Sequence, residues 1–177
     1  MPGTWKFSPH HSDNLIEQLL FNRGVKSEKE KQKFLHPKLE DYDKDLQILG
    51  AEKAKGRILK AVEKKELIIV YGDYDADGVC GIAVLYLGLT LIGAKVLPYI
   101  PHREKEGYGL SEVGLKNAQE KGASLVITVD NGIVAIKEVE FARSLGLDLI
   151  ITDHHVPLDK KPEALASWQL VPFTPPI

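Results

Sequence analysis

Short apolar runs alternate with amphipathic stretches through the second part of the chain. Four runs rich in Ile, Val and Leu are predicted to be strands: 67–72, 95–101, 124–129 and 148–152. The stretches between them are predicted to be helices: 79–94, 111–122 and 135–146. Buried strands that alternate with helices of this length are typical of βαβ units. The predicted fold class is therefore α/β, a doubly wound (Rossmann-like) parallel sheet with helices on both faces.

The first 66 residues have a different pattern, helical and charged, and are predicted to form a helical segment packed on the core. Three helices are expected there: 12–24, 27–35 and 50–66. Ser27 with Glu30 three residues later has the spacing of a capping box. The many Lys and Glu residues of this segment are interpreted as a solvated helix face.

The last residues, 167–177, interrupt the pattern. They read SWQLVPFTPPI, carry three prolines and show neither helical nor strand periodicity, which predicts an irregular tail. A doubly wound sheet is expected to continue after its fourth strand with another helix. The sequence thus predicts a helical segment at 1–66, a sheet domain at 67–166 and a tail at 167–177.

Composition narrows the class of protein. Hydrophobic residues make up 44% of the 177 residues and charged residues 27%, which is ordinary for a soluble globular protein. The net charge of −2 argues against binding to nucleic acid by bulk positive charge. A single cysteine excludes an internal disulfide. We expect a cytoplasmic protein, because no signal peptide and no apolar run of about 18 residues is present.

Acidic residues and histidines follow three of the predicted strands directly. They are Asp73, Asp75 and Asp77 after the first strand, Asp130 after the third, and Asp153, His154 and His155 after the fourth. In an open parallel sheet the carboxyl ends of the strands meet at one edge, where ligands bind at a topological switch point. We therefore expect these side chains to converge in one crevice.

Converging carboxylates repel one another, and a bound cation relieves that repulsion. Carboxylates with imidazoles suit Mg²⁺ or Mn²⁺, and two such ions about 4 Å apart would clamp a phosphoryl group and activate water. A calcium loop starting at Asp73 would need a Glu at its twelfth position, which is Val84. A solvated acidic turn, a simple Asn-Gly turn and a surface His pair are the structural alternatives for the three clusters taken singly.

The motifs DYDADG, VDNG and DHH, in this order at strand ends, resemble the first three motifs of the DHH phosphoesterase superfamily. Further stretches resemble its branch of single-strand-specific 5′→3′ DNA exonucleases: LLFNRGV, FLHPKLEDY, YGDYDADGV, YIPHREKEGYGLS and ITDHHVP. The resemblance runs over residues 15–166. It implies hydrolysis of phosphodiester bonds with Mn²⁺ or Mg²⁺, two ions, at the 5′ end of single-stranded DNA in repair and recombination.

The resemblance also implies roles for residues. Asp75 and Asp77 match the first metal-binding pair, Asp130 the aspartate that bridges the ions and takes part in catalysis, and His154 a histidine ligand. Some relatives carry a further histidine ligand four residues before the position of Asp75. The residue at that position in this chain is Tyr71, so no ligand is assigned there.

His155 matches the residue that contacts the scissile phosphate or assists the leaving group, a general-acid role that suits an imidazole. Asp73 and Asp153 are expected to support and orient the ligands.

The segment after the second strand, PHREKEGYGLS, is expected to contact substrate. Gly107 and Gly109 would let the backbone approach a phosphate, and Arg103 would pair with one. Tyr108 would stack on a base. The structural alternative is a flexible polar loop with a packed tyrosine.

Two parts of the superfamily pattern have no counterpart in the sequence, a fourth motif with a further metal-binding aspartate and the substrate-binding DHHA1 domain. On this ground the chain is expected to be an N-terminal fragment of such an exonuclease, with weak or no activity. Two alternatives stay open. One is a smaller hydrolase of oligonucleotides, cyclic dinucleotides or pyrophosphate, and the other is an inactive metal- or partner-binding remnant.

Overall fold

The computed structural model describes residues 7–38 and 50–169. The chain divides into two compact units, one of Met1–Gln47 with Pro172–Ile177 and one of Ile48–Val171. The division falls at Gln47 rather than at the predicted residue 66, because the helix at Ala51–Glu63 packs on the sheet through Ala54 and Ala61.

The described part of the first unit holds two short helices, α1 (Leu15–Asn22) and α2 (Glu28–Leu35). The predicted capping box is present at the start of α2. The Ser27 Oγ accepts from the Glu30 N–H at 3.2 Å, and the Ser27 N–H donates to the Glu30 carboxylate at 2.8 Å. These two bonds satisfy backbone donors that the first turn of a helix leaves open.

The second unit is built on a five-stranded parallel sheet with the order β2-β1-β3-β4-β5. Its strands are β1 (Leu67–Tyr71), β2 (Lys95–Tyr99), β3 (Ala123–Val129), β4 (Asp148–Asp153) and β5 (Ala166–Gln169). The chain runs outward from β1 to β2 and then crosses back to β3, so the switch point lies between β1 and β3. The four strands predicted from the sequence and the doubly wound fold are confirmed.

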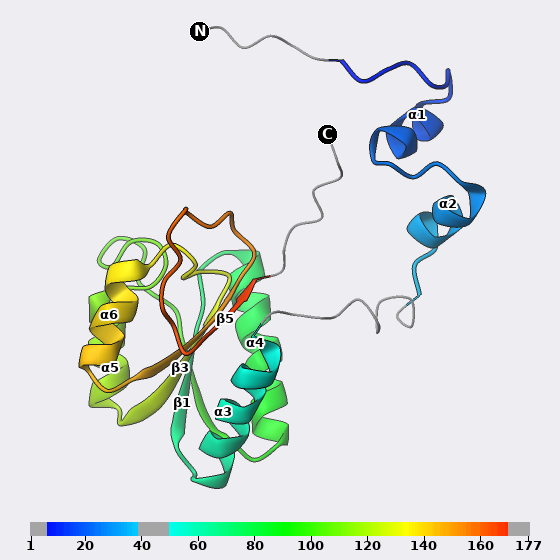
Figure 1. Ribbon diagram of the computed structural model, residues 1–177. Helices are drawn as coiled ribbons and strands as arrows, with labels where there is room; N and C mark the ends of the chain where they lie inside the picture. The colour runs from blue at the N-terminus through cyan, green and yellow to red at the C-terminus, as the bar shows by residue number, and fades with distance from the viewer. Residues whose placement is uncertain (1–6, 39–49, 170–177) are drawn as a thin grey trace, which may run out of the picture. The chain divides into compact units, whose positions relative to one another are not determined.

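Helices cover both faces of the sheet (Figure 1). The helices α3 (Ala51–Glu63) and α4 (Ala76–Leu91) lie on one face, and α5 (Glu112–Glu120) and α6 (Ile136–Ser144) on the other. Successive side chains of a strand point to opposite faces of the sheet, so each strand contributes to a hydrophobic core on either face. Ile68 and Val70 of β1 pack on the α3/α4 face, whereas Ile69 and Tyr71 pack on the α5/α6 face.

The strand β5 corrects the predicted tail. Ser167, Trp168 and Gln169 belong to a strand that pairs in parallel with β4, with Thr152 opposite Trp168. Four residues are too few to show an alternating pattern, so this strand depends on its neighbour β4 rather than on a local signal. The remainder of the predicted tail, 170–177, lies outside the described residues.

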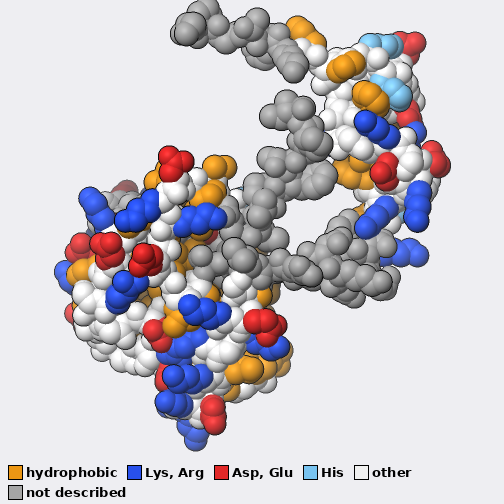
Figure 2. Space-filling view, in the orientation of Figure 1, with side chains coloured by type: hydrophobic (Ala, Val, Ile, Leu, Met, Phe, Trp, Pro, Cys, Tyr) orange, Lys and Arg blue, Asp and Glu red, His pale blue; other side chains and the backbone are white. Residues whose placement is uncertain are grey.

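Helix α4 carries no charged residue after Asp77, although many of its positions face outward. Gly78, Ile82 and Leu89 are buried, whereas Val84 and Leu87 are 71% and 61% exposed. Elsewhere the visible surface of this unit mixes Lys and Arg with Asp and Glu (Figure 2), in keeping with the small net charge. Among the described helices, none is long and apolar enough to cross a membrane.

Candidate metal centre

The turn after β3 places Asp130 at the carboxyl edge of the sheet. Asp130 has a φ of 61°, in the left-handed region that a non-glycine residue adopts at a cost of about 1–2 kcal/mol. Its N–H donates to the Thr152 carbonyl of β4 at 2.9 Å. The Thr128 hydroxyl donates to the Asn131 carbonyl at 2.7 Å, and Asn131 itself is buried. The neighbouring strand therefore holds this strained turn in place.

The end of β4 supplies the two histidines, and Asp153 fixes the second of them. The buried Asp153 carboxylate accepts from the Ile133 N–H at 2.9 Å and from the His155 N–H at 3.0 Å. Its Oδ1 also lies 2.7 Å from the His155 Nδ1. This bond raises the pKa of the His155 imidazole above its ordinary value, and it directs the other ring nitrogen away from Asp153.

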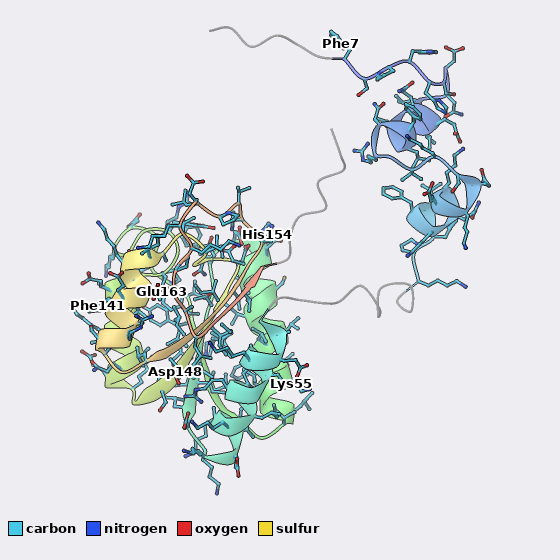
Figure 3. All side chains as sticks on the ribbon, viewed as in Figure 1. Phe7, Lys55, Phe141, Asp148, His154 and Glu163 are labelled. Carbon is cyan, nitrogen blue, oxygen red and sulfur yellow. The ribbon has the colours of Figure 1, made fainter. Side chains whose placement is uncertain are left out.

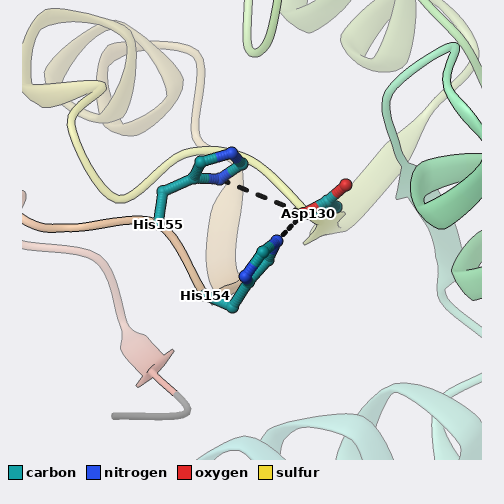
Figure 4. Close-up of side chains that lie close together, drawn as sticks. All are labelled: Asp130, His154 and His155. Carbon is teal, nitrogen blue, oxygen red and sulfur yellow. Dashed lines mark ion pairs between the residues drawn. The ribbon is translucent and has the colours of Figure 1, made fainter. Parts of the chain in front are cut away.

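Three of the predicted residues converge (Figure 4). The Asp130 Oδ1 lies 2.9 Å from the His154 Nε2 and 4.0 Å from the His155 Nδ1. One donor atom from each residue lies within 4.8 Å of the others, a spacing that permits shared coordination of one ion. Burial raises the pKa of Asp130; the His154 ring opposes this shift and Asp75 adds to it. Figure 3 shows His154 at the same edge of the sheet as the end of β4.

The predicted acidic residues after β1 lie at the start of α4. Asp75 is its N-cap, and the Oδ1 accepts from the Gly78 N–H at 2.9 Å. Asp77 lies exposed in the first turn and lines the same cavity as Asp130 and His154. Asp75 and Asp77 lie outside the group of three whose donor atoms are within 4.8 Å. Asp77 thus borders the centre along the cavity, and Asp75 is near enough to raise the pKa of Asp130, while capping of α4 accounts for one of its oxygens.

The donor set fits a hard or borderline divalent cation. The Asp130 Oδ1 has no hydrogen-bond donor besides the His154 ring among the described residues, and the Asp73 Oδ2 has none at all, although both are buried. Buried carboxylate oxygens without donors are costly, and a cation would compensate them. Carboxylate and imidazole donors are the ligands that Mn²⁺ and Mg²⁺ take. The residues present therefore fit the predicted metal.

A cavity of about 470 Å³ opens beside this cluster on the α4 side. Its polar rim consists of Asp77, Asp130, Thr152, Asp153 and His154. Its walls are apolar and come from Gly81, Val84, Leu85 and Val129.

The loop between β2 and α5 reaches the other side of the cluster. The Tyr108 hydroxyl lies 3.5 Å from the His155 Nε2 and 3.5 Å from the Asp130 carbonyl oxygen. Burial, with the nearby Asp73, raises the pKa of Tyr108 to about 12, so its phenol stays protonated at neutral pH. The Arg103 guanidinium lies 5.3 Å from the centre of the Tyr74 ring. Tyr74 packs edge-on against Tyr108, with ring centres 6.3 Å apart.

The same loop is held by hydrogen bonds from side chains for which the sequence predicted no such role. The Tyr71 hydroxyl donates to the Gly109 carbonyl at 3.1 Å and accepts from the Ser111 N–H at 3.2 Å. Glu106 accepts from the Tyr99 hydroxyl at 2.7 Å and from the His102 N–H at 2.8 Å. Tyr71 is thus buried beneath the loop.

The two glycines of the loop differ in position. Gly107 is exposed with a φ of 82°, whereas Gly109 is buried with a φ of 77°. The carbonyl of Gly109 is engaged by Tyr71, so the exposed backbone of this pair is that of Gly107.

Known proteins resemble this chain in sequence and in fold. The chain is 43% identical over 156 residues to the single-stranded-DNA-specific exonuclease RecJ of Bacillus subtilis, which covers 88% of this chain and 20% of that protein. It is 40% identical over 153 residues to the RecJ of Escherichia coli, covering 86% of this chain and 26% of that protein. The chain therefore spans a fifth to a quarter of the length of these curated relatives.

Solved structures give the same result. An exonuclease RecJ bound to manganese superposes with a TM-score of 0.66 at 38% identity, over 72% of this chain and 33% of that one. The RecJ of Thermus thermophilus in complex with Mn²⁺ superposes with a TM-score of 0.65 at 30% identity, over 85% of this chain and 20% of that one.

The family model for the DHH family, N-terminal domain, matches residues 67–173. This range includes all five strands and every residue of the cluster around Asp130. Because the match covers more than half of the chain, this protein belongs to the DHH family, and its sheet unit carries that family's N-terminal domain.

Proposed function

We propose that this chain carries the metal-binding half of a phosphodiester hydrolase that acts on single-stranded DNA from its 5′ end. The observation that carries the proposal is the Asp130–His154–His155 cluster at the switch-point edge of the sheet, bordered by Asp75 and Asp77. The likeness to RecJ exonucleases, including two solved with manganese, supports both the substrate and the metal.

Asp75, Asp77, Asp130 and His154 would hold Mn²⁺ or Mg²⁺, with Asp130 between two ions. Metal ions at such a site polarise the phosphate and lower the pKa of bound water. Asp130 suits a bridging position because its carboxylate is aimed between both histidines and its turn is fixed by β4.

His155 is the proton donor in this proposal. Its Nδ1 is held by Asp153, its Nε2 lies 3.5 Å from the Tyr108 hydroxyl on the side of the proposed substrate loop, and its raised pKa favours the protonated ring near neutral pH. Asp153 and Asp73 orient the ligand loops without touching the reacting atoms.

The loop of Arg103, Gly107, Tyr108 and Gly109 would hold the DNA. Arg103 is exposed and pre-positioned by Tyr74, which suits pairing with a phosphate oxygen. Tyr108 is 57% exposed beside His155, where a base can stack on its ring.

A nuclease assay tests the proposal. We expect the chain to release mononucleotides from 5′-labelled single-stranded DNA slowly with Mn²⁺, since weak activity is predicted for it, and not at all with EDTA. The substitution Asp75→Ala should abolish release, whereas Asp159→Ala, an exposed aspartate of the loop after β4, should not. Release that persists in Asp75→Ala, or no release under any metal, would contradict the proposed activity. Parallel reactions with pyrophosphate and cyclic dinucleotides would identify a hydrolase of the smaller substrates.

A further inference from the structure

The metal cluster has two unlike sides. On the α5/α6 side, His155 faces Tyr108, the ring of which packs against Tyr74. On the α4 side, His154 lines the apolar cavity together with Val84 and Val129. The two imidazoles, with ring centres 4.7 Å apart, thus have different neighbours, and only the Tyr108 side has a proposed occupant.

A phosphate held at the cluster carries one substituent on each of its two ester oxygens. If one nucleoside lies against Tyr108, the other must leave the phosphate elsewhere. The cavity is adjacent, since Asp130 and His154 belong to the metal cluster and also line the cavity, together with Asp77. Its volume of about 470 Å³ is within the range of about 300–1,000 Å³ that small-ligand sites occupy.

The lining selects the chemistry of the occupant. Among the described residues, neither Lys nor Arg lines the cavity, which disfavours a second phosphate there and therefore a longer run of the strand. The Thr152 hydroxyl already donates to the Thr128 carbonyl at 2.6 Å, and the Asp153 carboxylate is bonded to Ile133 and His155. The other polar lining residues, Asp77, Asp130 and His154, are the proposed metal ligands, which leaves apolar side chains to contact a base.

We propose that this cavity is a nucleoside subsite, which takes the sugar and base on one side of the scissile phosphate through apolar contact with Val84, Leu85 and Val129. The inference rests on the proposed function, because it presumes a phosphodiester at the metal cluster. Contact through apolar faces makes the subsite tolerant of base identity.

Helix α4 offers a matched pair of variants. Val84 lines the cavity and Leu87 does not, yet both are exposed, at 71% and 61%, on the same uncharged helix. Val84→Phe fills the cavity, and Leu87→Phe adds similar apolar bulk outside it. Val84→Asn serves as a second variant that removes apolar contact without filling space. Thermal unfolding of all three checks that each variant folds.

Binding is measured with a single-stranded thymidine oligonucleotide that has phosphorothioate linkages, in Mn²⁺, and with versions that lack one base near the 5′ end. For at least one position of the missing base, wild type and Leu87→Phe should bind the intact oligonucleotide about tenfold more tightly than the oligonucleotide that lacks this base. Val84→Phe and Val84→Asn should bind the two alike.

Three results would overturn the subsite. They are an equal base preference in Val84→Phe and Leu87→Phe, no base preference in wild type, and a loss of thermal stability in Val84→Phe with the base preference intact. The last result would indicate that a protein segment fills the cavity. The proposed function fails separately, if wild type binds with the expected preference but releases no nucleotide from ordinary DNA.

Discussion

Replacing Tyr71 by Phe removes one oxygen atom beneath the substrate loop and leaves the shape of the core unchanged. The hydroxyl donates to the Gly109 carbonyl and contacts both the N–H and the hydroxyl of Ser111, at 3.1–3.2 Å. Burial raises the pKa of Tyr71 to about 12, so it is a donor at any physiological pH. The ring itself is fully buried between β1 and α5, where Gly114 leaves room for it.

The cost follows from the groups left behind. In the Phe variant the Gly109 carbonyl and the Ser111 N–H lose this partner, whereas the Ser111 hydroxyl keeps its bond to Glu106 at 3.0 Å. A buried polar group without a partner costs about 1–3 kcal/mol, and water that reaches the partly exposed Ser111 reduces this cost. We expect a loss of about 2 kcal/mol in the free energy of unfolding.

Urea unfolding of wild type and Tyr71→Phe measures this loss as a lower midpoint with an unchanged slope. Because the same hydroxyl anchors the loop that carries Tyr108, KM for single-stranded DNA should rise several-fold while kcat changes less. Tyr86→Phe is the matched control. Tyr86 is a half-buried tyrosine of α4, and within the described chain its hydroxyl makes no hydrogen bond.

A Tyr71→Phe variant as stable as wild type would refute the anchoring role of the hydroxyl. A loss of stability with KM unchanged would refute the link between the anchor and substrate binding.

Three further predictions concern the metal cluster. Asp130→Asn should abolish stabilisation by Mn²⁺, which in wild type is about 2.7 kcal/mol at a metal concentration of a hundred times Kd. The metal-free variant should be no less stable than metal-free wild type, because a buried charge near Asp75 is removed. Thermal unfolding with Mn²⁺ and with EDTA measures both effects. The affinity for Mn²⁺ should fall as the pH is lowered toward the raised pKa of Asp130, because a proton competes with the metal, and calorimetry that finds a constant affinity from mildly acidic to neutral pH would contradict this. Asp153→Asn should lower the pKa of His155, since its hydrogen bond to the Asp153 carboxylate is the main cause of the upward shift; an NMR titration of the ring that finds no change would show another cause.

The strands and the convergence of the cluster could be predicted because both depend on short-range signals. Each buried strand is a compact apolar run, and a parallel sheet necessarily gathers its strand ends at one edge. Asp130 therefore meets His154 and His155, although more than twenty residues separate it from them in the sequence. The capping box at Ser27 is likewise local.

The parts that could not be predicted depend on contacts between distant loops. Tyr74 contacts Arg103, and Tyr71 binds Gly109, so the end of β1 and the loop after it meet the loop after β2, and neither pair has a fixed spacing in sequence. The left-handed turn at Asp130 is stabilised by Thr152 of the next strand in addition to the local bond from Thr128 to Asn131. The interpretation of Asn-Gly as a simple turn described the local chain but not this cross-strand bond.

The division of labour between His154 and His155 has a consequence for how this segment tolerates insertions and deletions. The two rings lie 4.7 Å apart and both reach Asp130, yet only His154 lines the cavity and only His155 meets Tyr108. Removing or adding one residue between Thr152 and the pair would move His154 away from Asp130 and His155 away from Asp153, although both imidazoles would still be present. The number of residues after β4 is therefore as strict a requirement as their identity, and a length change there would erase the site while leaving its composition intact.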